Sequence, residues 1–186
     1  YTIQNYLADQ IQVPRFKTDR PEFDEAEKGI NERINRLMSI KGKHSVDHIH
    51  KELGHIMWEC VGMARDAEGL KVAIEKLQQL KKDFLTNLRI PGDKDSLNVE
   101  LEKALRLQDF IELGELMAHD ALDRNESCGG HFRTEFQTPD GEALRNDDEY
   151  AYVSCWEYQG EDKGPVMHKE PLDYEFIVRQ QRNYKS

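Results

Sequence analysis

Residues 95–124 read DSLNVELEKALRLQDFIELGELMAHDALDR, and this stretch decides the fold. Its apolar residues recur at helical spacing and occupy more than one face of a helix that starts at Asp95 or Ser96. A helix that is apolar over a wide arc is typical of the interior of a helical bundle. Its length is roughly 40 Å, since each residue adds about 1.5 Å. The sequence therefore predicts a bundle that contains this segment.

Three earlier segments also space their apolar residues by three and four positions. They predict helices at residues 21–40, 45–65 and 66–89. Ser45 and Asp66 suit the N-caps of the second and third helices, because a short polar side chain accepts a backbone N–H there. Short connections favour antiparallel neighbours, so we expect an up-and-down bundle of three to four long helices.

The composition changes at Asn125, after which Gly, Pro, Asp and aromatic residues become frequent. Alternation with a period of two predicts a strand at residues 150–158, and YEFIVR at residues 174–179 predicts a second strand. The start of the chain has no clear period. The predicted fold class is mainly α: an extended lead-in (1–20), a helical bundle (21–124), and a small irregular α+β tail with a short sheet (125–186).

Bulk composition excludes several classes of function. The net charge is −10 and there is no basic block, which argues against nucleic-acid binding. No apolar run approaches the roughly 20 residues that span a bilayer, so we expect no direct membrane insertion. Cys60, Cys128 and Cys155 are widely spaced and form no CxxC motif, which favours a reducing compartment.

A group of histidines is the first candidate site. His44, His48 and His55 could place imidazoles along one bundle helix, and two ligands four residues apart can bind one metal ion. However, His44 lies at or before the helix cap, and no HExxH motif is present. Surface histidines on a bundle helix are the commoner explanation, and we predict no metal site.

The segment RNESCGGHFR, residues 124–133, is the second candidate. Cys128 with His131 could form a thiolate and its base, and Ser127 with His131 could form a hydroxyl pair. Neighbouring positions do not by themselves make a catalytic dyad, since geometry decides. Alternatively, the two glycines form a helix C-cap and the polar side chains satisfy buried backbone groups.

These residues also carry a family resemblance. RNESCGGHFR, followed by Thr138, Gly141–Ala143, Asp147–Glu149 and His168–Leu172, resembles the C-terminal signature of succinate dehydrogenase and fumarate reductase flavoproteins. Residues matching family motifs, with an expected structural or docking role, are Arg124, Glu126, Ser127, Cys128, Gly129, Gly130, His131, Arg133 and Glu170. The chain departs from the family at Cys128, where Arg is usual, and at Gly130, where Ala is usual.

The resemblance implies a parent flavoprotein that interconverts succinate and fumarate with FAD. It also implies an iron–sulfur subunit as partner and, through it, a membrane cytochrome b subunit. The parent would then be cytoplasmic and peripheral on the inner face of the bacterial membrane. The family's flavin- and substrate-binding motifs have no counterpart in this sequence. We therefore expect a structural and subunit-docking fragment that is inactive alone, binds no flavin and self-associates through uncovered apolar surface.

Two other interpretations stay open from the sequence. The chain could be a free-standing helical interaction protein or metal-binding bundle. It could also be the equivalent region of L-aspartate oxidase or adenylylsulfate reductase, which share the family architecture. The segments GEALRNDDE and HKEPL favour the succinate and fumarate group.

Overall fold

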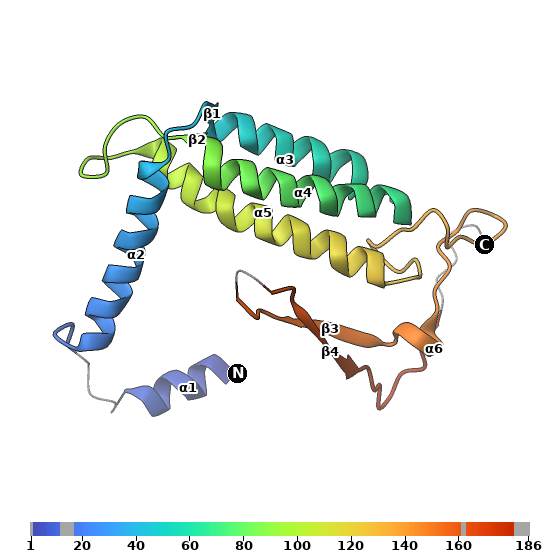
Figure 1. Ribbon diagram of the computed structural model, residues 1–186. Coiled ribbons are helices and arrows are strands. Elements are labelled where there is room, and N and C mark those ends of the chain that lie inside the picture. Colours follow the sequence, from blue (N-terminus) through green and yellow to red (C-terminus); the bar gives the residue numbers. More distant parts are fainter. Residues whose placement is uncertain (1, 12–16, 161–162, 181–186) are drawn as a thin grey trace.

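The computed structural model describes residues 2–11, 17–160 and 163–180 (Figure 1). The elements in chain order are α1 (Thr2–Gln10), α2 (Pro21–Ser39), β1 (His44–Ser45), α3 (Val46–Cys60), α4 (Ala67–Asn87), β2 (Leu88–Arg89), α5 (Val99–Asp123), α6 (Asp147–Tyr150), β3 (Tyr152–Glu157) and β4 (Val166–Pro171). The fold is thus a helical domain followed by a small α+β tail, which confirms the predicted fold class.

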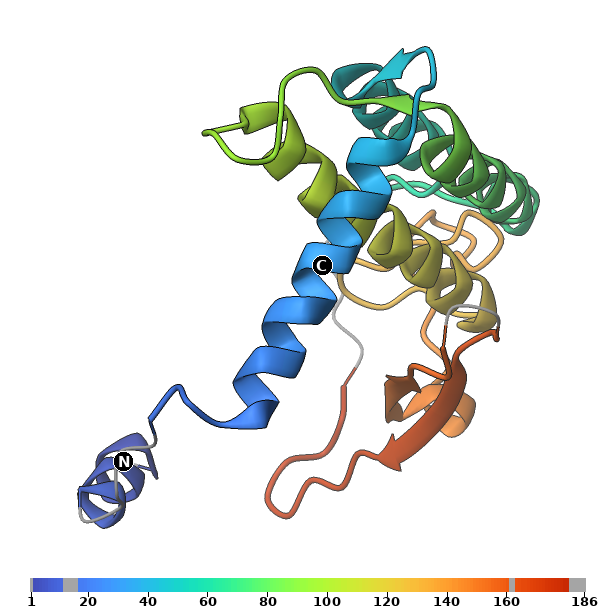
Figure 2. The same ribbon diagram turned by 60° about the vertical axis from the view of Figure 1, so that its left-hand side comes forward.

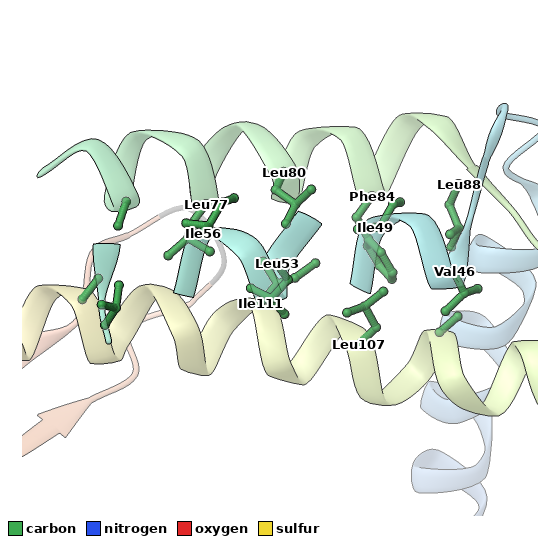
Figure 3. Packing of buried hydrophobic residues seen from close by; sticks show 14 of the residues in the cluster. Val46, Ile49, Leu53, Ile56, Leu77, Leu80, Phe84, Leu88, Leu107 and Ile111 are labelled. Atoms are coloured by element: carbon green, nitrogen blue, oxygen red, sulfur yellow. The ribbon is translucent and has the colours of Figure 1, made fainter. Parts of the chain in front are cut away.

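Helices α3, α4 and α5 lie side by side and enclose the core (Figures 1 and 2). Their directions alternate, so the predicted up-and-down arrangement is confirmed for these three helices. Figure 3 shows that the three helices point their apolar side chains at one another. The buried residues labelled there are Val46, Ile49, Leu53, Ile56, Leu77, Leu80, Phe84, Leu88, Leu107 and Ile111. Burial of these side chains is the main force that holds the helices together.

Helix α2 matches the prediction of residues 21–40 to within one residue, but it packs differently from the other long helices. It leaves the bundle at an angle (Figure 2), and Leu37 is its one buried residue. Its apolar residues Phe23 and Ile30 are 46% and 56% exposed. The Arg33 guanidinium ties α2 to α5 by donating to the Leu105 carbonyl at 2.9 Å and to the Asp109 carboxylate at 2.8 Å. The spacing of apolar residues in α2 therefore predicted a helix correctly, but most of these residues are not buried in this structure.

The junction between α2 and α3 is held against the end of α4. Strands β1 and β2 pair in parallel, and the Gly42 amide donates to the Leu88 carbonyl at 3.0 Å. A Cβ atom at Gly42 would lie 1.9 Å from the Asn87 carbonyl carbon and oxygen. Only glycine allows so close an approach between two backbones.

Helix boundaries correct several sequence predictions. The lead-in is not extended throughout, because residues 2–10 form α1; Ile3, Tyr6 and Leu7 in fact keep helical spacing. The lead-in residues 12–16 lie outside the described residues. The predicted N-caps Ser45 and Asp66 are confirmed, since they accept from the amides of His48 and Gly69.

The remaining helix ends differ from prediction for local reasons. The helix predicted to reach residue 65 ends at Cys60, and Arg65 forms a β-bridge with Arg133 of the tail. The helix predicted to reach residue 89 ends at Asn87, because Leu88 and Arg89 pair with β1 as strand β2. Helix α5 starts after Asn98, not at Asp95 or Ser96. The Asp93 carboxylate accepts from both amides of Asp95 and Ser96, which closes a loop there instead of a helical turn.

The tail sheet also corrects one prediction. The strand expected at residues 150–158 exists as the shorter β3, Tyr152–Glu157, because Tyr150 ends α6. Its partner is β4 and not residues 174–179. β3 and β4 pair as an antiparallel hairpin that runs from Tyr152 opposite Pro171 to Glu157 opposite Val166. Pairing with the nearest downstream segment closes a short loop, which costs less chain entropy than pairing with a later one.

The core predicts a clear contrast between two isoleucines. Ile111 on α5 is 1% exposed, so Ile111→Ala should leave a cavity and lower the free energy of unfolding by about 2 to 5 kcal/mol. Ile30→Ala on α2 makes the same chemical change at an exposed position and should cost less than about 0.5 kcal/mol. Urea denaturation measures both values. Equal losses for the two variants would contradict the assigned core.

Candidate functional site

The Arg124–Arg133 segment begins where α5 ends, and its last residue turns back onto that helix end. Arg133 is 2% exposed. Its Nη1 donates to the carbonyls of Ala121 at 3.0 Å and Leu122 at 3.3 Å. These carbonyls belong to the last helical turn, which lacks backbone partners and carries the negative end of the helix dipole. Arg133 therefore caps α5 with a buried positive charge.

A carboxylate completes the shell around this guanidinium. Glu135 accepts from Arg133 Nε at 3.2 Å and from Nη2 at 3.1 Å, which is a two-pronged ion pair. The same carboxylate accepts from the Ala67 amide at 2.6 Å, at the N-terminus of α4. The Arg133 hydrogen bonds, aided by the Ala67 amide and outweighing the effect of burial, lower the pKa of Glu135 to about 2. One ion pair thus joins the end of α5, the start of α4 and the tail.

Ser127 fixes the backbone of the segment from inside. Its hydroxyl donates to the Arg133 carbonyl at 3.1 Å and accepts from the Arg133 amide at 2.9 Å. The Ser127 amide donates to the Leu144 carbonyl at 2.8 Å. Because the hydroxyl proton is directed to a backbone carbonyl, the hydroxyl pair with His131 that the sequence allowed is not formed.

The two glycines form a tight turn, not the helix C-cap considered from the sequence. Cys128 and His131 exchange backbone hydrogen bonds at 2.8 and 3.0 Å across this turn. Gly129 has a φ of +59°, a left-handed backbone conformation that residues with a Cβ atom rarely adopt. The C-cap of α5 is Arg124, four residues before Cys128. The glycines therefore shape a hairpin beyond the helix end.

His131 is held by the start of the same segment. Its Nε2 lies 2.9 Å from the Arg124 carbonyl oxygen. Burial lowers the pKa of His131, and the positive charges of Arg65, Arg133 and Arg124 lower it further, against the opposing effect of the carbonyl. The imidazole is therefore neutral at pH 7 and donates its Nε2 proton to that carbonyl. A base role toward Cys128 has no support in these contacts, since Cys128 and His131 meet through their main chains.

Arg124 and Glu126 tie the segment to the sheet of the tail. Arg124 donates to the Glu126 carboxylate at 2.9 Å and to the carbonyls of Tyr150 at 3.2 Å and Tyr152 at 3.0 Å. Its guanidinium also lies over the Tyr152 ring, 5.0 Å from the centroid. Glu126 is buried, and its second oxygen accepts from the Asn146 amide at 2.8 Å. The charges of this pair are therefore satisfied within the chain.

Sequence reasoning missed Glu135 and Arg65. The Arg65 amide donates to the Phe132 carbonyl, and its own carbonyl accepts from the Thr134 amide at 2.9 Å. An acidic residue two positions after Arg133 was a usable signal for Glu135. Arg65 is far away in sequence and could be placed only by the fold.

The other candidate residues lie apart from this segment. Glu170 is exposed on β4, opposite Val153. The His44 Nδ1 lies 2.6 Å from an Asp83 oxygen, and its ring centroid is 4.4 Å from that of His48. His55 is exposed. Within residues 2–11, 17–160 and 163–180, no three His, Cys, Asp or Glu side chains are grouped so that they could hold a metal ion.

Comparison with known proteins gives one family. The sequence profile described as "Fumarate reductase flavoprotein C-term" matches residues 50–184. The fumarate reductase flavoprotein subunit of Proteus vulgaris is 32% identical over 111 residues, which are 60% of this chain and 18% of that protein. This chain therefore spans about a fifth of the length of that relative.

Solved structures show the same fold. Escherichia coli quinol fumarate reductase matches with a TM-score of 0.70 at 21% identity, over 91% of this chain and 28% of that one. Adenylylsulfate reductase from Archaeoglobus fulgidus matches with a TM-score of 0.64 at 21% identity, over 91% of this chain and 27% of that one. At this identity both matches establish the fold alone.

The buried guanidinium predicts a large effect of one substitution. Arg133→Met should lower the free energy of unfolding by about 3 kcal/mol, because the α5 carbonyls and Glu135 lose their partner. Arg106→Met removes an exposed (i, i+4) partner of Glu102 and should cost less than about 1 kcal/mol. Urea denaturation of both variants gives the comparison, and a loss at Arg133 no larger than at Arg106 would refute the assigned role.

The lowered pKa of Glu135 predicts a specific acid response. A depressed carboxyl pKa stabilises the fold above the unfolded value of 4.5, and this contribution is lost as the pH falls toward about 2. Glu135→Gln should therefore show a shallower fall in unfolding free energy between pH 5 and about 2. Glu68→Gln, at an exposed carboxylate, serves as control and should follow the unmodified chain. If the unfolding free energy of both variants falls equally with pH below about 5, the result would argue against the Glu135 ion pair.

Proposed function

The chain belongs to the family of fumarate reductase flavoprotein C-terminal domains, and we propose that it is the packing and subunit-docking part of a longer enzyme. That enzyme would use FAD to interconvert succinate and fumarate. The proposal rests on the family membership and on the fraction of the relatives that the chain spans.

One observation carries the structural part of the proposal: the charged groups of the Arg124–Arg133 segment are bonded within the chain. Arg133 and Arg124 donate to carbonyls and carboxylates, and Glu126 accepts from Arg124 and a backbone amide. A guanidinium that binds a dicarboxylate must present its donors to the substrate. The N–H groups of these two arginines donate to α5 and to the tail sheet, and this supports a structural role.

The sequence lacks the glycine motif of a dinucleotide-binding turn. The motif GxGxxG, which forms the turn that receives a dinucleotide pyrophosphate, does not occur in the sequence. FAD in this proposal is held, together with the dicarboxylate, by another part of the longer protein. The expected contribution of this chain is to support that part and to position it relative to partner subunits.

Uncovered apolar surface supports the docking role. Phe110, Leu113 and Met117 recur at helical spacing along α5 and are 44%, 55% and 48% exposed. A contiguous exposed stripe of large apolar side chains is typical of a protein–protein contact. The partners that we propose are the iron–sulfur subunit and, through it, a membrane cytochrome b subunit. The enzyme would then sit on the inner face of the bacterial cytoplasmic membrane.

The described helices are consistent with attachment through partners. None of the helices in the described part of the chain is both long and apolar enough to cross a bilayer. Membrane association in this proposal is therefore assigned to the partner subunits.

The isolated chain tests the division of roles. Purified and titrated with FAD, it should show no flavin absorbance that survives gel filtration, and no succinate-dependent dye reduction. Circular dichroism and a cooperative urea transition provide the control that the chain is folded. Stoichiometric FAD retained by folded chain, or succinate oxidation by it, would contradict the proposal.

A further inference from the structure

The outer face of the β3–β4 hairpin carries a thiol, an imidazole and a carboxylate next to one another. The register pairs Cys155 with His168, and Glu157 with Val166. Alternation along a strand puts Cys155 and Glu157 on the same face of β3. The Cys155 side chain is exposed. The other face turns toward α5, where the Trp156 indole donates to the Asp120 carboxylate at 2.8 Å.

The imidazole of His168 is oriented by the carboxylate. Its Nε2 lies 2.7 Å from a Glu157 oxygen, a diagonal contact across the two strands. The hydrogen bond from His168 lowers the pKa of Glu157, so this carboxylate stays ionised. A neutral imidazole that donates from Nε2 keeps a lone pair on Nδ1. Directly opposed residues of an antiparallel pair have Cβ atoms about 4.5–5.5 Å apart, so the side chains of Cys155 and His168 are neighbours on this face.

We propose that Cys155 is a reactive thiol that forms mixed disulfides with small disulfides of the glutathione class, with His168 as its base and Glu157 as the group that orients His168. This site is separate from the Arg124–Arg133 segment and does not depend on the proposed enzyme activity. A nucleophile, a base and an orienting carboxylate are the components that activate thiols in general.

The exchange step balances without a further reactant. His168 Nδ1 takes the proton of the Cys155 thiol, and the thiolate attacks one sulfur of the small disulfide. A bond forms between Cys155 Sγ and that sulfur as the original S–S bond breaks. Its electron pair leaves on the second sulfur, which takes the proton back from His168. Cys155 is oxidised to the mixed disulfide, and the departing half of the small disulfide is reduced to a thiol.

The charged groups that the strand register places near Cys155 offer no other stabilisation for a thiolate than that from His168. Glu157 on β3 and Glu170 on β4 share this face, and both carboxylates oppose a thiolate. Lys169 offers no compensation here, because its ammonium lies over the Tyr152 ring at 4.3 Å, on the opposite face. His168 is therefore the neighbour to which we assign the role of accepting the thiol proton.

The other two cysteines are internal controls. Cys60 is half-buried against the bundle core, and Cys128 is half-buried in the turn whose His131 donates to the Arg124 carbonyl. Trypsin places the three thiols on separate peptides, at residues 52–65, 125–133 and 146–163. One digest thus reports the modification of each cysteine in the same sample.

The test treats the natural protein that carries this chain with glutathione disulfide, followed by acid quenching, alkylation, digestion and mass spectrometry. At pH 7, Cys155 should be modified about tenfold faster than Cys60 and Cys128. His168→Phe should slow Cys155 about tenfold at pH 7, and the two rates should converge at pH 9, where solvent alone deprotonates a thiol. A purely structural effect of the substitution would not depend on pH in this way.

Two further variants complete the test. Glu157→Gln keeps the imidazole but weakens its orientation, so it should slow Cys155 by a smaller factor than His168→Phe. His119→Phe, on α5, should leave the Cys155 rate unchanged. The proposal is overturned if Cys155 reacts no faster than the other two cysteines, or if His168→Phe slows it equally at pH 7 and pH 9.

Discussion

The ion pair between Arg133 and Glu135 is the contact on which the arrangement of helices and tail depends. A guanidinium that is 2% exposed must find partners for its donors, because burying a charge without them costs several kcal/mol or more. The carbonyls of the last turn of α5 and the Glu135 carboxylate supply these partners. Since Glu135 also binds the α4 N-terminus at Ala67, the ends of two core helices and the tail are fixed by one buried charge.

The same principle extends outward from this point. Arg124, at the C-cap of α5, donates to the carbonyls of Tyr150 in α6 and Tyr152 in β3 and to the buried carboxylate of Glu126. Hydrogen bonds to backbone carbonyls therefore attach the tail to the end of α5. This attachment leaves the apolar stripe of α5 and most of α2 uncovered. Exposed apolar surface of this kind is what the proposed docking role needs.

Local signals predicted most of the bundle, and long-range contacts explain the errors. Periodicity located α3, α4 and α5, and the caps Ser45 and Asp66 were read directly from the sequence. Periodicity shows which face of a helix is apolar but not what covers it, so the departure of α2 was not predictable. YEFIVR has strand-forming residues, but pairing depends on which neighbour is available, and β4 lies closer to β3. The motif residues were found from the sequence, whereas Arg65, distant in sequence, needed the fold. The division into a bundle at residues 21–124 and a tail at residues 125–186 stays a prediction.

Native-state hydrogen exchange tests most directly whether the buried Arg133 charge joins bundle and tail into one unit. Two backbone amides report on the tail: that of Ser127, which donates to the Leu144 carbonyl, and that of Thr134, which donates to the Arg65 carbonyl. The amides of the middle turns of α4 and α5 report on the bundle. If the account is right, the tail amides open with the same free energy as the bundle amides, since both need global unfolding. Tail amides that exchange several kcal/mol more easily than those of α4 and α5 would contradict it.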